Sequence, residues 1–418
     1  MTTRGIDQDK TTNFGFSQVA DGPNLDAFGN MRVTNPAFVF DAQLNYDLAR
    51  LLYEQITSGG AITYDSTNGQ AVLSLTASPP GSNAYLQSFE YFRYQPGRSQ
   101  KVFMSFSAGG NTAVAGVTKF IGYSDGVNGY EFQMTSAGPQ FALLSSTSQG
   151  NQIIAQSAWN LDRLDGTGSG IALDLTKTQI LVIDFQALYA GRIRFGFDIN
   201  GQVFYCHEID NANSSAYPYI RTANLPVRCG LSCTTIATDT MNMICCSVTS
   251  EGGDSSDLGY EFSASGSVIA ASGAQTHILS IQPLPTYQGF TNRSKIVFDD
   301  FELLNTGTVP VQWYLCLGCA LTGTNTFTAA NSSYSAVGYN TAGTLSGSPA
   351  IVLASGFVSS SGSGSKYSLD QTISANIREP ISLDHAGNTR TLGTLSILVA
   401  GIGGTAQCYA TINWHEVR

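Results

Sequence analysis

Apolar and polar residues alternate with a period of two along much of the chain. The alternation is clearest over 193–199 and resumes over 203–209. This period is typical of a strand that buries one face and leaves the other in contact with polar surroundings. Asn200 and Gly201 separate the two stretches, and this pair is the strongest short signal for a tight hairpin turn. The pattern therefore predicts an antiparallel hairpin.

Further stretches of the same kind follow at short intervals. They cover 120–134, 311–317, 395–399 and 410–416, whereas 180–185 is a nearly continuous apolar run, as in strands buried on both faces. Turn signals rich in Gly, Asn and Asp lie between such stretches. Short alternating strands with turns between them are typical of sandwiches and jelly rolls. The predicted fold class is therefore all-β, with two β-sandwich or jelly-roll domains.

One segment departs from the period of two. Within 41–55, the leucines at Leu44, Leu48, Leu51 and Leu52 have the spacing of one helix face. Two alternatives remain open for this segment. It is either a helix or an irregular arm that docks its leucines on a neighbouring molecule.

The domain division follows from where apolar residues disappear. Over 251–257 the sequence contains only Glu, Gly, Asp and Ser, which is typical of a linker or long surface loop. Turn signals without core residues mark the start of the chain, and such arms are often ordered only by partners. We expect an extended N-terminal anchoring arm over 1–38, a jelly-roll sandwich over 39–250 and a second sandwich over 251–418.

Composition and charge exclude several classes of function. Of the 418 residues, 42% are hydrophobic and only 12% are charged, and the formal net charge is −10. No Lys/Arg cluster is present, which argues against binding to nucleic acid or to an anionic membrane surface. No apolar run reaches the ~18 residues that span a bilayer. The first residues lack the apolar region of a secretory signal, so we expect folding in the cytoplasm of the producing cell.

A glycine-rich loop is the first candidate for chemistry. Asp162 and Asp165 lie just before the run Gly-Thr-Gly-Ser-Gly at 166–170. Their carboxylate oxygens could coordinate Ca²⁺, which takes 6–8 oxygen ligands. The loop lacks EF-hand spacing. The alternative is a tight turn in which both carboxylates accept hydrogen bonds from nearby backbone N–H groups. We favour the turn and predict no metal.

The eight cysteines allow a second hypothesis. Cys316 and Cys319 form a Cys-x-x-Cys pair, and Cys229 with Cys233 is the other spaced pair that could complete a zinc site. Buried free thiols are the favoured alternative, since a reducing cytoplasm disfavours a disulfide framework.

No motif of an enzyme is present. None of the four histidines lies in a Gly-x-Ser-x-Gly elbow or a His-Glu-x-x-His helix. A glycosidase pair of carboxylates formed in space, for instance among Asp125, Glu131 and Asp198, is an alternative that sequence leaves open. We predict that the protein is not an enzyme and assign no catalytic, cofactor-binding or metal-binding residue. The four histidines are His207, His277, His385 and His415.

The aromatic residues also have two interpretations. With 19 Tyr and 22 Phe, the chain could present a sugar-binding platform or use these rings for core and interface packing. Tyr91, Phe92 and Tyr94 alternate imperfectly, and Tyr217 and Tyr219 lie in a predicted loop. The loop pair would be the first choice for contacts with a glycan.

Several short stretches together resemble a family of virion structural proteins of tailed bacteriophages. They are 26–36 (DAFGNMRVTNP), 94–99 (YQPGRS), 159–168 (WNLDRLDGTG, running on to 181), 250–253 (SEGG) and 412–418 (INWHEVR). The resemblance implies a place in a virus particle and no established chemistry. Residues 40–250 also resemble a concanavalin-type jelly roll, in which 195–201 is similar to a strand and tight turn of laminin-G-like domains.

The resemblance implies a non-enzymatic structural protein on the exterior of a tailed-phage virion, assembled in the host cytoplasm. By analogy with phage exterior proteins we expect a homotrimer that binds the major capsid protein or other virion proteins. It would decorate or stabilise the capsid as a cement protein or head spike, or form a tail or baseplate appendage. The alternative is a receptor- or glycan-binding module of a tail fibre or spike. A depolymerase is a third hypothesis.

Overall fold

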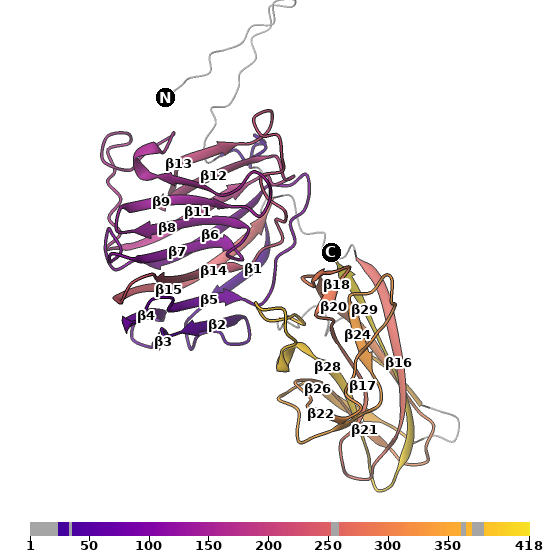
Figure 1. Ribbon diagram of the computed structural model, residues 1–418. Helices are drawn as coiled ribbons and strands as arrows, with labels where there is room; N and C mark the ends of the chain where they lie inside the picture. The colour runs from indigo at the N-terminus through magenta and orange to yellow at the C-terminus, as the bar shows by residue number, and fades with distance from the viewer. Residues whose placement is uncertain (1–23, 33–35, 252–258, 361–364, 370–379) are drawn as a thin grey trace, which may run out of the picture.

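The computed structural model describes residues 24–32, 36–251, 259–360, 365–369 and 380–418. Its regular elements are antiparallel strands, with two short 3₁₀ turns at Gln156–Ala158 and Thr391–Gly393. The all-β fold class predicted from the alternation is confirmed. The strands form a first domain and a second domain, whose strands run in different directions in Figure 1.

The first domain is a sandwich of an eight-stranded and a seven-stranded sheet. Across the larger sheet the order is β13 (Gln202–Asp210), β12 (Arg192–Ile199), β11 (Thr178–Phe185), β6 (Gln100–Ser107), β15 (Ala237–Ser250), β4 (Gln70–Ser78) and β3 (Ala61–Asp65), with β1 (Ala37–Gln43) paired to β15. Across the smaller sheet it is β10 (Gln152–Ala155), β9 (Gly138–Leu144), β8 (Gly129–Thr135), β7 (Val117–Ser124), β14 (Val227–Cys233), β5 (Asn83–Ser88) and β2 (Tyr53–Ser58).

Aromatic rings from the two sheets meet in the first core. Phe141 of β9 stacks on Phe195 of β12 with ring centroids 4.6 Å apart, and Tyr130 of β8 lies 4.7 Å from Phe185 of β11. All four are fully buried. Burial of one such side chain contributes about 1.5–3 kcal/mol, so these contacts fix how the two sheets face each other.

The second domain pairs a four-stranded with a six-stranded sheet. Phe301 and Trp313 pack edge to face between them, 5.0 Å apart. The first sheet has the order β16 (Tyr260–Ala270), β29 (Ala406–Val417), β20 (Lys295–Asn305) and β27 (Ser365–Leu369). The second has β23 (Thr328–Ala329), β24 (Val337–Asn340), β17 (Thr276–Pro283), β28 (Leu395–Gly401), β21 (Val311–Leu317) and β26 (Ile351–Val358). Two short pairs are β18 (Thr286–Tyr287) with β19 (Phe290–Thr291), and β22 (Leu321–Gly323) with β25 (Gly343–Leu345).

The hairpin expected around Asn200 and Gly201 joins β12 to β13. Both residues have positive φ, +57° and +81°, as the two central positions of a type I′ turn require. The apolar run at 180–185 is the core of β11, and its residues from Leu181 to Phe185 are buried. Both predictions are confirmed.

The segment 41–55 is not a helix, and two of its four leucines are buried within their own domain. Strand β1 continues to Gln43 and β2 begins at Tyr53, with turns between them. Leu44 and Leu48 are buried in the core of their own domain. The helical spacing was misleading because pairing of β1 with a strand 200 residues away, and burial of these leucines, override local propensity.

Residues 24–32 dock on the first domain. Arg192 donates hydrogen bonds to the carbonyl oxygen of Ala27, and Arg194 donates one to that of Leu25. The N–H of Ala27 donates to the hydroxyl of Ser99. Residues 1–23 and 33–35 of the expected arm lie outside the described residues, and anchoring on virion partners stays a prediction.

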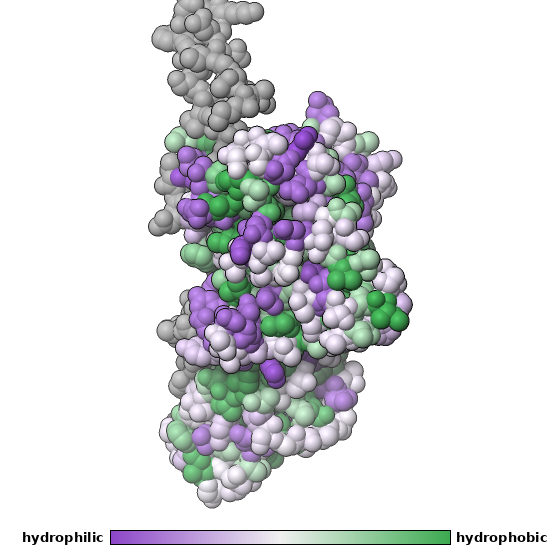
Figure 2. All heavy atoms as spheres, turned by 90° about the vertical axis from the view of Figure 1, so that its left-hand side faces the viewer, coloured by the Kyte–Doolittle hydropathy of each residue, from purple (hydrophilic) through white to green (hydrophobic). Residues whose placement is uncertain are grey.

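The surface of the first domain is mixed in character. Figure 2 shows hydrophilic and hydrophobic residues alternating in small patches over one face. In the part of the chain that the structure covers, no helix has the length and hydropathy to cross a membrane. Because the patches on this face are small, binding of a ligand or partner there would depend on local groups of side chains.

Candidate functional site

The outer face of the seven-stranded sheet carries a continuous set of polar and aromatic side chains. Arg228 of β14 lies opposite Gln87 of β5, and Phe120 of β7 lies opposite Gln133 of β8. Opposed residues on antiparallel strands project to the same face, while the intervening residues, such as Leu86, lie in the core. We call this surface the polar face. It comprises Gln87, Arg228 and Glu131 in one row, and Tyr85, Phe120, Gln133 and Gln140 in the next.

An arginine resting on two aromatic rings forms the centre of the polar face. The guanidinium carbon of Arg228 lies 4.4 Å from the ring centroid of Tyr85 and 5.2 Å from that of Phe120. The two rings are themselves 5.2 Å apart and meet edge to face. Among the described residues, none accepts a hydrogen bond from the buried Nε of Arg228. The two rings thus hold the planar guanidinium of Arg228 in position, and its Nε–H group makes no hydrogen bond to them.

Two glycines form the floor beside this arginine. Gly122 lies opposite Arg228, and Gly230 lies between Tyr85 and Phe120 in the sheet register. A Cβ atom at Gly230 would press against the Ala84 carbonyl oxygen and the Tyr85 ring, and one at Gly122 would meet neighbouring backbone. Glycine is therefore required at both positions. Because glycine has no side chain, nothing projects from the sheet in the middle of the polar face.

Amide side chains continue the polar face toward β9. The Gln140 amide donates to Gln133 at 2.8 Å, and the Gln133 amide donates to the Glu131 carboxylate at 2.8 Å. Both glutamines are half-buried. Because each amide is oriented by the next, the outermost polar atoms are held ready for a ligand.

Glu131 ends this chain of hydrogen bonds. Its carboxylate also accepts a hydrogen bond from the Ser124 hydroxyl, and only 3% of the residue is exposed. Burial raises the pKa of Glu131, although the bonds from Ser124 and Gln133 oppose that effect. The carboxyl group thus serves mainly to orient its neighbours.

The structure brings together two of the three carboxylates considered as a glycosidase pair. Asp125 and Glu131 belong to the β7–β8 hairpin, whereas Asp198 lies in β12 of the opposite sheet. Asp125 accepts hydrogen bonds from the N–H groups of Val127 and Asn128 at 2.8 and 2.7 Å, and so stabilises the turn. Both carboxylates of the hairpin already have structural partners.

The aromatic residues singled out from the sequence lie elsewhere. Tyr91, Phe92 and Tyr94 are buried, and Tyr219 is fully buried with its hydroxyl 3.0 Å from that of Tyr130. Tyr217 is exposed but lies outside the polar face. Sequence reasoning missed Tyr85 and Phe120. Their alternation with the core residues next to them was the available signal.

The glycine-rich loop is a turn stabilised by its own aspartates. Asp162 accepts hydrogen bonds from the N–H groups of Leu164 and Ser169, each at 2.9 Å, and Asp165 accepts one from Thr167. Within the described ranges, no group of three or more His, Cys, Asp or Glu side chains could hold a metal ion.

The cysteines expected as an alternative zinc set are divided between the domains. Cys316 and Cys319 lie in one buried cluster of the second domain, whereas Cys229 and Cys233 lie in β14 of the first. All eight cysteines are free thiols.

Each of the four histidines has a hydrogen-bond partner. His207 accepts a hydrogen bond from the N–H of Asn160, and His277 contacts Gly343 and Ser280. His385 contacts Glu54, and His415 contacts Asp299.

The second domain borders one end of the polar face. Glu54 of β2, which lies opposite Gln87, accepts hydrogen bonds from the backbone N–H of His385 at 2.8 Å and from its Nδ1 at 2.7 Å. Arg293 of the second domain stacks on Tyr91 at 4.3 Å, and Arg390 stacks on Phe89 at 3.2 Å. These contacts fix where the second domain meets the sheet.

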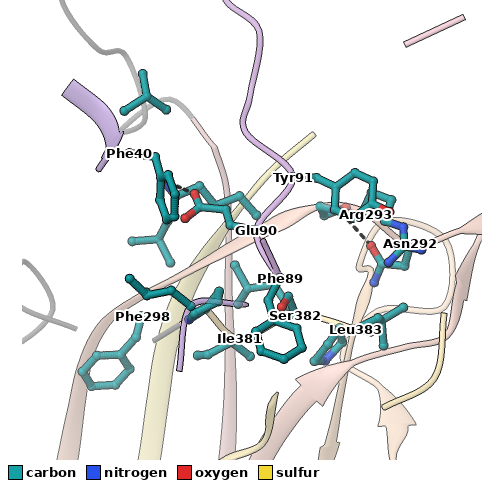
Figure 3. A pocket seen from close by; sticks show the side chains of 18 of the residues that line it. Phe40, Phe89, Glu90, Tyr91, Asn292, Arg293, Phe298, Ile381, Ser382 and Leu383 are labelled. Atoms are coloured by element: carbon teal, nitrogen blue, oxygen red, sulfur yellow. Dashed lines mark hydrogen bonds and ion pairs between the residues drawn. The ribbon is translucent and has the colours of Figure 1, made fainter. Parts of the chain in front are cut away.

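A cavity of about 250 Å³ lies along the same boundary. Figure 3 shows Phe40 and Glu90 from the first domain facing Phe298 and Ile381 from the second. The Glu90 carboxylate is 3.0 Å from the ammonium group of Lys295. Since its walls come from both domains, the cavity depends on how they are held together.

Comparisons with known proteins give only distant likenesses. No family model and no curated protein matches the chain. An endo-1,3-beta-glucanase from Streptomyces sioyaensis is 12% identical, with a TM-score of 0.38, over 51% of this chain and 96% of that one. A carbohydrate esterase of the Shiga toxin-encoding bacteriophage phi24B is 11% identical (TM-score 0.32; 51% and 99%). The carbohydrate recognition domain of Emp46p is 12% identical (TM-score 0.30; 50% and 94%).

Each of these likenesses covers about half of this chain. Membership of the phage virion family therefore stays a prediction.

Proposed function

We propose that the protein is a non-enzymatic glycan-binding module, and that a saccharide binds on the polar face. The observation that carries this proposal is the stacking of Arg228 over Tyr85 and Phe120 above a floor of glycines. A sugar ring offers an apolar face of C–H groups and a rim of hydroxyls. The polar face offers the partly exposed ring of Tyr85 beside fixed donors and acceptors, which is the complementary arrangement.

The polar groups suit hydroxyl recognition for a further reason. A guanidinium donates in a planar fork, and amides both donate and accept. Arg228 is held by rings, and Gln133 and Gln140 are held by each other. Little side-chain entropy is then lost on binding, which favours affinity.

The proposal is non-enzymatic because of the state of the carboxylates. Hydrolysis of a glycosidic bond uses two carboxyl groups that flank the bond, one as acid and one as base or nucleophile. Glu131 is buried and bonded to Ser124 and Gln133, and Asp125 stabilises its own turn. Neither is free to act on a ligand lying over Arg228.

A structural role on a tailed-phage virion is the second candidate, and the two roles are compatible in a receptor-binding tail fibre or spike. The observation that favours it is the ionic attachment of residues 24–32. Arg32 bonds the buried Asp184 at 2.7 Å and also pairs with Glu251. An N-terminal arm that anchors the protein on a neighbour would need a firm attachment to its own domain, and these ion pairs supply one. Homotrimer formation and contacts with the major capsid protein belong to this candidate.

A glycan array followed by calorimetry on its best ligand tests the binding proposal. Purified full-length protein should bind a defined set of neutral or acidic glycans. Arg228→Ala and Tyr85→Ala should each weaken binding at least about tenfold, which corresponds to about 1.4 kcal/mol. Tyr217→Ala, which removes an exposed ring outside the polar face, should bind like the unmodified protein.

The circular dichroism spectrum of each variant should match that of the parent. Absence of binding across the array would contradict the proposal, and so would full affinity in Tyr85→Ala. Release of reducing sugar from a bound glycan would contradict its non-enzymatic part.

A further inference from the structure

A buried chain of hydrogen bonds in the second domain runs from a histidine to a serine that lies beside a pair of thiols. Ser280 of β17 and Cys316 of β21 both lie opposite Ser396 of β28. All three are therefore on the same outer face of the six-stranded sheet. The short pair β22–β25 covers this face, since Leu345 packs against the cluster of Cys316, Cys319 and Leu398, and the Gly343 carbonyl lies near His277. Cys319 follows the end of β21 and joins the same cluster.

The direction of the hydrogen bonds is set at the histidine. Nδ1 of His277 lies 2.9 Å from the carbonyl oxygen of Gly343, and a carbonyl can only accept. Nδ1 therefore carries a proton. Burial lowers the pKa of His277, which keeps the ring neutral and makes Nε2 an acceptor.

Two serines extend the chain from Nε2 to the thiols. The Ser280 hydroxyl lies 2.7 Å from Nε2 and donates to it. The Ser396 hydroxyl lies 2.6 Å from that of Ser280 and donates in turn. Ser396 lies opposite Cys316 in the sheet register, and its hydroxyl lowers the pKa of Cys319. A proton leaving Cys319 can thus pass through both hydroxyls to His277 if each hydrogen bond reverses its direction.

The two cysteines are not equivalent in this cluster. When Cys319 ionises, the Cys316 thiol and the Ser396 hydroxyl, once reversed, can donate to the thiolate, which lowers the pKa of Cys319, whereas the pKa of Cys316 is raised. Hydrogen bonds to a thiolate favour the charged, nucleophilic form. Gly318, with φ of +70°, makes the turn that returns Cys319 toward Cys316.

We propose that Cys316 and Cys319 are a peroxide-reactive dithiol site that closes to a disulfide. The Cys319 thiolate attacks one oxygen of hydrogen peroxide, the O–O bond breaks, and hydroxide leaves and takes up a proton to become water. Cys319 is then a sulfenic acid. The Cys316 sulfur attacks it, the S–O bond breaks, and a second water leaves with the Cys316 proton. The dithiol loses two electrons and the peroxide gains them.

A small oxidant suits the geometry of this site. Cys316 is fully buried and Cys319 is 7% exposed, so a bulky disulfide would be excluded.

The adjacent cysteines of the first domain lack this paired arrangement of two thiols. Cys245 and Cys246 are adjacent in a strand and point to opposite faces, and Cys246 is bonded to the Tyr53 hydroxyl.

The experiment is peroxide titration of the reduced full-length protein, followed by alkylation under denaturing conditions and peptide mass spectrometry. Residues 296–366 form one tryptic segment that contains these two cysteines and no other. After treatment with about one equivalent of hydrogen peroxide, this segment should lose both alkylation sites together. The remaining cysteines should stay alkylated. Retention of both thiols, or a disulfide between other cysteines, would overturn the proposal.

Variants test the order of the steps. In Cys316→Ser, dimedone should trap a sulfenic acid on Cys319, whereas Cys319→Ser should leave Cys316 unreactive. Cys246→Ser, a buried cysteine of the first domain, is the matched control and should leave disulfide formation unchanged. Sulfenic acid on Cys316 instead of Cys319 would contradict the assignment of the nucleophile.

His277→Gln tests the relay. Glutamine can keep hydrogen bonds to Gly343 and Ser280 but does not take up a proton. The rate of disulfide formation should fall about tenfold or more while the melting temperature is retained. His207→Gln, at a buried histidine of the first domain, should react at the parental rate. An unchanged rate in His277→Gln would remove the proton relay from the mechanism.

Discussion

At the scale of single residues, the strongest constraint is one fully buried carboxylate. Asp184 of β11 contacts Arg194 at 2.5 Å, Arg32 at 2.7 Å and the Tyr205 hydroxyl at 2.6 Å. Burial alone would raise its pKa, but the two guanidinium groups and the hydroxyl outweigh burial, and the pKa of Asp184 is lowered. The ionised form is therefore the one that the fold requires.

Asp184→Asn should destabilise the first domain by about 3–5 kcal/mol, because the buried Arg194 loses its counter-charge and Arg32 keeps only Glu251. Urea denaturation at pH 7 measures this loss. Since the folded pKa is depressed, the contribution is fully present above about pH 4 and is lost as pH falls through the folded value. The variant should thus lose less stability in acid than the parent. Asp210→Asn, at an exposed position of β13, should cost little, and an equal loss there would contradict the assignment.

Lys101 gives the opposite pH dependence. Burial, and then the charge of Arg32, lower the pKa of its ammonium group from 10.5 to about 8. Between these values the unfolded chain binds a proton that the folded chain does not, so this group adds stability as pH rises. Lys101→Met should be more stable than the parent at pH 7, by at most about 3 kcal/mol, and the difference should shrink toward pH 10. Denaturation at several pH values measures it. The exposed Lys177→Met should show no such trend.

At the scale of elements, the β12–β13 hairpin depends on its turn. Gly201 has φ of +81°, which a residue with a side chain rarely adopts. Gly201→Ala should therefore lower the free energy of unfolding by about 1 kcal/mol. Gln202→Ala, at the exposed start of β13, serves as the control in the same denaturation experiment. Equal effects in both variants would show that the turn is not limiting.

The same hairpin shows which parts of the fold could be predicted from the sequence. Its strands and its turn are adjacent in the chain, so alternation and the Asn-Gly pair specify it locally. The segment 41–55 could not be assigned in this way. Strand β1 is created by pairing with β15, from Ala37 opposite Ser250 to Gln43 opposite Cys245, and local spacing carries no information on that partner.

The candidate site was inaccessible from the sequence for a similar reason. Tyr85, Phe120 and Arg228 lie on three strands whose order in the sheet is β7, β14, β5. Without knowledge of that strand order, nothing in the sequence places Arg228 beside Tyr85 and Phe120. The turn role of Asp162 and Asp165, by contrast, depends only on neighbouring backbone and could be predicted.

At the scale of the whole molecule, cations of the second domain resting on aromatic rings of the first hold the two domains together. Arg293 stacks on Tyr91, and Arg390 stacks on Phe89. Burial lowers the pKa of Arg390 to about 10, which reflects how fully this group leaves water at the boundary. Each such contact contributes about 0.5–2 kcal/mol. The coupling between the domains therefore depends on a small number of side chains.

Arg293→Ala combined with Arg390→Ala should uncouple the unfolding of the two domains. Both sandwiches keep their own cores, so each should still fold, but the less stable one should now melt first. Scanning calorimetry should show one main transition for the parent and two separated transitions for the double variant. Arg50→Ala, at an exposed position away from these rings, should melt like the parent. Because His385 and Glu54 join the same boundary to the edge of the polar face, glycan affinity should also decline modestly in the double variant. A single unshifted transition would mean that the boundary is held by other contacts.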